Sequence, residues 1–149
     1  MAKVEVKVEV EEPLMNIKEQ LERDEKRSKD LYIDSEGNPT IGIGRNLRRG
    51  LSEDEIDYLF KNDLNDHLKD LLAALPWAEF IDDARRGALL NMAFNMGVPN
   101  LLGFKKMLAA MKAKHWEVAS KEALNSLWAK QVGARAIRLS KQILTGVWK

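Results

Sequence analysis

The chain has 149 residues, of which 45% are hydrophobic and 32% are charged, and it contains no cysteine. This composition is typical of one globular domain and excludes a fold held by disulfide bonds. No apolar run approaches the roughly 20 residues of a membrane-spanning helix, and the N-terminus lacks the apolar core of a signal peptide. We therefore expect synthesis in the cytoplasm and no membrane insertion.

The net charge of +1 hides an asymmetry along the chain. Residues 101–149 carry ten basic and two acidic side chains, a balance of +8, whereas residues 1–100 have a balance of −7. A basic segment is attracted to anionic polymers such as cell wall or nucleic acid. A solvated helical face explains the same pattern, and charge alone favours that interpretation.

Residues 1–14 alternate Val with Lys or Glu, which is the period of a β-strand. A single strand is not stable alone, so we expect an N-terminal extension, mobile or paired with a sheet edge, ahead of a domain at 15–149. In residues 15–26, Ile17 and Leu21 share one helical face, which predicts a short helix that opens this domain.

Two short strands are predicted next, at 31–33 and 40–44, around a segment at 34–39 that is rich in turn-forming residues. Together they indicate a β-hairpin. Gly42 and Gly44 are unusual within a strand, and they favour a bend or a close approach of the backbone to another group.

A capping box at Ser52 and Glu55 predicts the start of a long helix that ends near Pro76. Apolar residues follow at helical spacing: Ile56, Leu59, Phe60, Leu64, Leu68, Leu71 and Leu75. About six turns would join a small β lobe to a helical lobe.

The remainder of the chain reads as helical. A helix is predicted at 82–96, and its segment 87–94 is apolar almost all round, which indicates the buried centre of the helical lobe. Shorter helices are predicted near 104–112, 115–128 and 134–144.

Three polar residues can meet around one cleft if the hairpin folds back on the first helix. Glu25 ends that helix, Asp34 begins the turn, and Thr40 begins the second strand. Glycosidic bonds are cleaved by two carboxyl groups that flank the bond, and a nearby hydroxyl can hold water. Taken alone, the pattern is better explained as three surface residues.

Other matches strengthen the pattern. From Glu25 the chain reads eight residues, Asp34, five residues, Thr40, and then Ile-Gly-Ile-Gly, and this segment resembles the phage-type lysozymes, the endolysins of tailed bacteriophages. The resemblance covers about residues 15–149 and continues in 84–97, Gly103-Phe104, Trp116, Trp128 and 145–148.

The resemblance implies an α+β, lysozyme-like fold. A small β-hairpin lobe at about 27–51 would face a larger helical lobe made of 15–26 and 52–149, and the cleft would bind an extended glycan. The implied activity is that of a muramidase, which hydrolyses the β-1,4 bond between N-acetylmuramic acid and N-acetylglucosamine in bacterial peptidoglycan and lyses the cell. A monomer that acts on the wall after release is expected.

Residue roles follow from the resemblance. Glu25 is the expected general acid, and Asp34 with Thr40 is expected to activate water, so that the product has inverted configuration. Phe94, Asn95 and Arg135 match positions that bind substrate, and the arginine would also pair with the catalytic glutamate.

Several residues depart from the family pattern. Lys26 stands where many relatives have glycine, and Arg45 stands where a histidine is common. Arg27 and Lys29 replace apolar residues of the first strand. Two peripheral glycan-contact positions hold the larger residues Met107 and Glu122. These departures bear on substrate contacts and rate more than on the type of reaction.

No cofactor is expected, since His67 and His115 lack the spacing of metal ligands. Two other functions stay open. A lytic transglycosylase would use Glu25 on the same substrate without a second carboxylate. A non-catalytic basic module would bind wall polymer or nucleic acid, although the resemblance itself implies no nucleic-acid partner.

Overall fold

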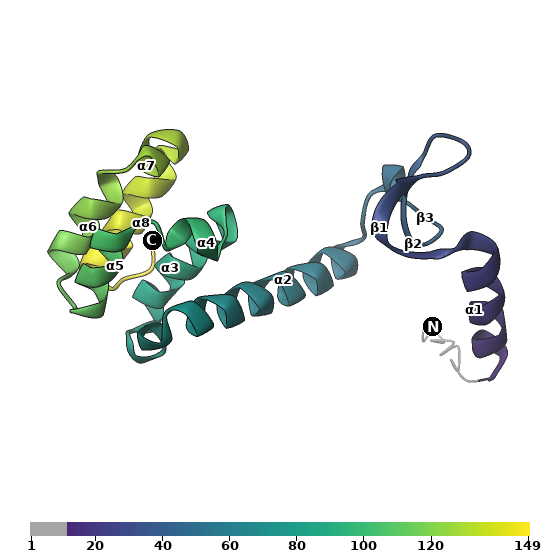
Figure 1. Ribbon diagram of the computed structural model, residues 1–149, viewed down its shortest axis with the longest axis horizontal. Helices are drawn as coiled ribbons and strands as arrows, with labels where there is room; N and C mark the ends of the chain where they lie inside the picture. The colour runs from purple at the N-terminus through teal and green to yellow at the C-terminus, as the bar shows by residue number, and fades with distance from the viewer. Residues whose placement is uncertain (1–11) are drawn as a thin grey trace, which may run out of the picture. The chain divides into compact units, whose positions relative to one another are not determined.

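The computed structural model describes residues 12–149, so the strand pattern of residues 1–11 lies outside the described part of the chain. The chain divides into two compact units, Met1–Ile56 and Asp57–Lys149. The boundary falls in the first turn of the long helix α2 (Glu53–Ala74), drawn in teal in Figure 1. No helix of residues 12–149 is both long enough and apolar enough to span a membrane.

The first unit confirms the predicted hairpin and extends it. Its elements are α1 (Glu12–Glu25), β1 (Arg27–Ile33), β2 (Pro39–Ile43), β3 (Arg45–Asn46) and a 3-10 turn, η1 (Leu47–Arg49). The three strands form an antiparallel sheet in the order β1-β2-β3. The third strand and η1 were not predicted from the sequence. α1 begins at Glu12, three residues before the helix predicted at 15–26, and Pro13 is compatible with the first turn of a helix.

The register of the hairpin places Thr40, one of the predicted catalytic residues, opposite an aromatic residue of β1. Tyr32 of β1 pairs with Thr40 of β2, and Arg27 pairs with Ile43, but the pairing shifts between Ser28 and Tyr32. Such an irregularity bends the strand and increases its twist. Cross-strand partners have their side chains on the same face, so the tyrosine and the threonine share one face of the sheet.

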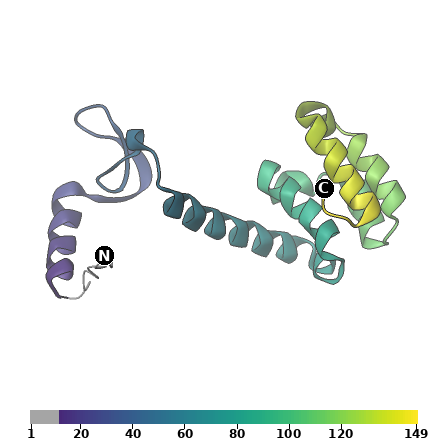
Figure 2. The same ribbon diagram turned by 180° about the vertical axis from the view of Figure 1, so that it is seen from behind.

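The second unit is helical and is built from α2 onward. After α2 come η2 (Pro76–Phe80), α3 (Asp83–Met96), α4 (Val98–Leu101), α5 (Lys105–Lys112), α6 (Trp116–Leu124), α7 (Leu127–Val132) and α8 (Ala134–Thr145). The single helix predicted at 115–128 is two helices, because the Ser126 side chain accepts a hydrogen bond from Ala129 N and starts α7. α6 and α8 lie side by side (Figure 2).

The core of this unit contains the predicted apolar segment of α3. Ala88, Leu89, Met92 and Ala93 are fully buried, together with Leu71 at the end of α2. The beginning of the apolar stripe on α2 behaves differently: Ile56, Leu59 and Phe60 are 45–51% exposed.

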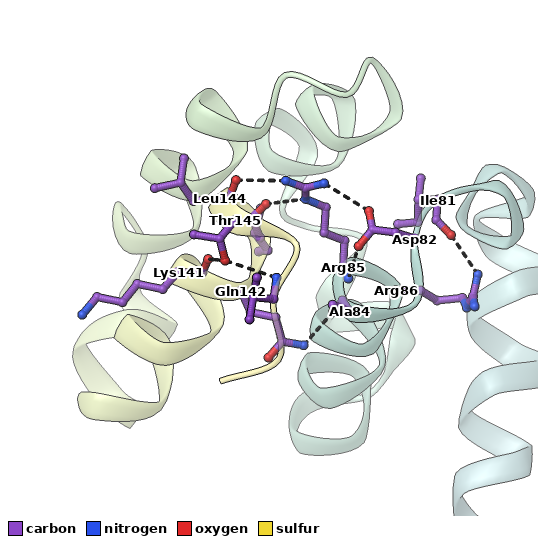
Figure 3. A network of polar contacts seen from close by, with 11 residues as sticks. Ile81, Asp82, Ala84, Arg85, Arg86, Lys141, Gln142, Leu144 and Thr145 are labelled. Atoms are coloured by element: carbon purple, nitrogen blue, oxygen red, sulfur yellow. Dashed lines mark hydrogen bonds and ion pairs between the residues drawn. The ribbon is translucent and has the colours of Figure 1, made fainter.

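The C-terminal end of α8 is capped by Arg85 of α3 (Figure 3). The guanidinium donates to Ile143 O at 2.6 Å and Leu144 O at 2.9 Å, and it stacks 4.0 Å from the centre of the Trp116 ring. The last carbonyls of a helix have no partner within the helix, so these bonds stabilise its end. Arg85 thereby ties α8 to α3.

Candidate functional site

The three predicted catalytic residues all lie in the unit Met1–Ile56. Glu25 is the last residue of α1, Asp34 follows β1, and Thr40 lies in β2. The Tyr32 hydroxyl donates to the backbone carbonyl of Glu25 at 3.3 Å, and Tyr32 is the cross-strand partner of Thr40. This aromatic residue therefore connects the end of the helix to the strand that carries the threonine.

The carboxyl group of Asp34 is held by the turn that follows it. Its Oδ1 accepts hydrogen bonds from the backbone N–H of Asn38 at 2.8 Å and of Glu36 at 2.9 Å. The Asn38 N–H holds the pKa of this carboxyl below its usual range; the Glu36 N–H, the Asn38 side chain and the positive charge of Arg48 act in the same direction, against partial desolvation. Asp34 is therefore a carboxylate at neutral pH.

Thr40 is buried, with only 3% of its surface exposed. Its hydroxyl donates to the carbonyl of Asn38 at 2.9 Å, which leaves the oxygen lone pairs to accept a further hydrogen bond. Asn38 thus contacts both Asp34 and Thr40. Asn38 was not singled out from the sequence, although aspartate and asparagine side chains in turns often bond to nearby backbone groups.

Glu25 itself is exposed, and the residue after it is in an unusual conformation. Lys26 has a φ of 68°, the left-handed region that favours glycine, and its Nζ lies 5.0 Å from the centre of the Tyr32 ring. A glycine at this position would adopt the same backbone without strain. The lysine makes a cation–π contact that glycine cannot make.

Two of the predicted substrate-binding residues lie at the C-terminal end of α3. Phe94 is 40% exposed. The centre of its ring lies 4.9 Å from the centre of the His67 ring and 5.9 Å from that of the Phe60 ring. Asn95 accepts a hydrogen bond from Trp128 Nε1 at 2.9 Å. Phe94 is therefore partly accessible beside two other rings.

Arg135, the third predicted substrate-binding residue, is oriented by α3. Its Nε and Nη2 donate to Asn91 Oδ1 at 2.9 and 2.7 Å. Asn91 was not identified from the sequence, since a helical asparagine gives no signal of its partner. The pairing of Arg135 with Glu25 stays a prediction.

A pocket of about 710 Å³ opens in the second unit. Met107 and Glu122, two of the expected departures from the family pattern, both line it, together with Phe104, Trp128, Lys105 and Lys106. It therefore offers aromatic surface and both signs of charge. Among residues 12–149, no cluster of three His, Asp or Glu side chains has the arrangement of a metal site.

Comparisons with known proteins agree with the family resemblance. The phage lysozyme family model matches residues 22–142. The chain is 34% identical to the pre-baseplate central spike protein Gp5 of Enterobacteria phage T4 over 90% of the chain, which spans only 28% of that protein. It is also 30% identical to probable T4-type lysozyme 1 of Dictyostelium discoideum, over 88% of this chain and 95% of that protein, and 28% identical to probable T4-type lysozyme 2, over 90% and 96%. The chain belongs to the phage lysozyme family of glycoside hydrolases.

Proposed function

We propose that the chain hydrolyses the β-1,4 bond between N-acetylmuramic acid and N-acetylglucosamine in bacterial peptidoglycan. One observation carries this proposal: Asn38 hydrogen-bonds both to the ionised Asp34 and to the buried Thr40 hydroxyl. The Tyr32 hydroxyl joins the same hairpin to the end of α1, where Glu25 lies. Two carboxyl groups and a hydroxyl are the parts that hydrolysis of a glycosidic bond requires.

Glu25 is the proposed general acid, and Asp34 is the proposed base. As the bond breaks, the proton of Glu25 moves to the departing sugar oxygen. A water molecule attacks the anomeric carbon from the opposite face and gives its proton to the Asp34 carboxylate. The backbone N–H groups that bind Asp34 keep it ionised before the reaction, and Thr40 Oγ1 accepts a hydrogen bond from the water and so orients it.

Phe94, Asn95 and Arg135 are the proposed substrate contacts. The exposed part of the Phe94 side chain would contact a sugar, and the guanidinium of Arg135, already oriented by Asn91, would bind an oxygen or carboxylate of the polymer. The Asn95 side chain would contact the substrate in a fixed orientation, because its carbonyl oxygen already accepts a hydrogen bond from Trp128.

The test replaces the proton donor with its closest isostere. Glu25→Gln should lower the rate of peptidoglycan clearing by at least about a hundredfold, since general acid catalysis contributes that much or more. Glu19→Gln, on the same helix and also exposed, is the matched control and should clear normally. Near-normal clearing by a folded Glu25→Gln protein would refute the assignment.

Product analysis separates hydrolysis from transglycosylation. The proposed reaction leaves a reducing muramic acid, whereas a lytic transglycosylase leaves an anhydro ring because the sugar's own hydroxyl attacks. Anhydro products from the unchanged protein would show that Asp34 and Thr40 do not activate water.

A further inference from the structure

We propose that Gly44 is a positioning residue that sets the place of the Glu25 carboxyl group. This inference rests on the proposed role of Glu25 as the general acid. It assigns a specific task to one of the two glycines that follow Thr40: the missing side chain at position 44 is the space in which the catalytic carboxyl lies.

The contact is direct and lies within one unit. Gly44 lies in the turn between β2 and β3, with a φ of 65°. A Cβ atom built on it would lie 2.8 Å from Glu25 Oε2, 3.1 Å from Glu25 Cβ and 3.3 Å from Glu25 Cδ. The carboxyl group therefore packs against the backbone of Gly44, and it occupies space that the methyl group of an alanine at this position would need.

Gly42 shows that backbone conformation does not account for this contact. Its φ of 69° is almost the same as that of Gly44, so both positions favour glycine for the same conformational reason. A Cβ atom at Gly42, however, would have no atom within 4 Å. Gly42 is a strand residue paired with Ser28, and Gly44 is a turn residue, but only the latter has the Glu25 side chain in the space that a Cβ atom would take.

The side chain of Glu25 is the part free to yield to a methyl group at position 44. Its backbone carbonyl is bonded to the Tyr32 hydroxyl, while its carboxyl is the end of a flexible, exposed side chain. Rotation of that side chain relieves the overlap with Oε2 and Cδ, whereas the tight 3.1 Å contact with Glu25 Cβ stays and the positive φ strains an alanine at position 44 as it does at position 42. The rotation also moves the proton donor, and a misplacement of about 1 Å can cost about a hundredfold in rate.

The two glycines form a matched pair for the test. Gly44→Ala should lower kcat for peptidoglycan clearing at least about tenfold below that of Gly42→Ala, with each measured well below its thermal midpoint. Cosedimentation with peptidoglycan should stay equal for both variants, because substrate binding is not altered. The inference is overturned if the two alanine variants lose the same activity, or if Gly44→Ala clears as well as the unchanged protein.

A second readout follows the carboxyl group itself. With ¹³C-labelled glutamate, the Cδ signal that Glu25→Gln removes should move in Gly44→Ala and stay in place in Gly42→Ala. Equal positions in both variants would overturn the inference, even when Glu25→Gln has confirmed the general acid.

A double-mutant cycle keeps the test decisive if Gly44→Ala folds poorly. Glu25→Ala removes the carboxyl, so Gly44→Ala should destabilise the Glu25→Ala background less than the unchanged protein, while Gly42→Ala should cost the same in both backgrounds. An equal cost of Gly44→Ala in the two backgrounds would show that the contact is not what position 44 requires.

Discussion

Thr40 is the residue whose proposed role depends most on its hydrogen bonds. Its proton goes to Asn38, so its oxygen can orient water only as an acceptor. Thr40→Val keeps the shape and removes the oxygen. We expect the fold to be retained, at a cost of about 1 kcal/mol for the lost hydrogen bond, and the clearing rate to fall about tenfold or more.

Thr40→Ser is the matched control, since it keeps the hydroxyl and should retain much more of the rate. The configuration of the first product, read by NMR before mutarotation, tests the same role. Water held by Asp34 and Thr40 attacks opposite the leaving group and gives inversion. A retained configuration would make Asp34 the direct nucleophile and leave no water for Thr40 to hold.

At the residue scale, the sequence identified the candidate acid, base and hydroxyl through their spacing but not the groups that hold them. Asn38 and Asn91 act through hydrogen bonds that exist only after folding. The sequence does not show which residue an asparagine will bind. Gly44 was expected to allow a bend or a close approach, and both are present. Which side chain it would approach was not visible, because Glu25 lies on a different element.

At the start of α2, the carboxylate of Glu55 takes part in two separate interactions. Glu55 accepts the backbone N–H of Ser52 at 2.9 Å, which completes the predicted capping box, and it also binds the guanidinium of Arg45 in β3. The Arg45 hydrogen bond and then the Ser52 N–H lower the pKa of Glu55 from 4.5 to about 2. The helix start is thus tied to the sheet.

This coupling predicts a pH dependence of stability. Because the folded pKa lies below the unfolded one, the stabilisation is fully present above about pH 4.5 and is lost as the pH falls toward about 2. Glu55→Gln keeps an acceptor for Ser52 but lacks the charge. Its thermal midpoint should lie below that of the unchanged protein at pH 7, and the gap should close between pH 4.5 and 2.

Glu53→Gln is the control for this pH dependence. Glu53 lies in the same turn of α2, and no ion pair of Glu53 is present in the structure of residues 12–149. The gap between this variant and the unchanged protein should vary little over the same range. A gap for Glu55→Gln that is equally flat would mean that the Arg45 pair adds no stability.

Elements with strong local signals were predicted well, and those set by tertiary contacts were not. The capping box and six-turn period located α2, and the apolar run located α3. The residue pattern alone predicted a first strand of three residues, 31–33, whereas the resemblance already placed Arg27 and Lys29 in it. β1 begins at Arg27, because pairing with β2 extends the strand through charged residues that give no local strand pattern. Such pairing is a property of the folded sheet rather than of the local sequence.

The charge asymmetry is the feature of the whole molecule that bears on its substrate. Three lysines of α5, at positions 105, 106 and 112, are exposed, and no ion pair of theirs is present in the structure of residues 12–149. Two of them line the pocket that also holds Met107 and Glu122. Unpaired surface cations of this kind attract an anionic polymer, and salt screens that attraction over about 10 Å at 0.1 M.

We predict that these lysines make wall binding depend on salt. Cosedimentation with peptidoglycan should weaken as ionic strength rises, and reversing Lys105, Lys106 and Lys112 to Glu should flatten that dependence. The matched control reverses Lys29, Lys61 and Lys69, which are also exposed and change the net charge equally. If both triple variants give the same curve, net charge and not the α5 lysines governs binding. If the α5 variant keeps the salt dependence of the unchanged protein, this basic surface is only a solvated helical face.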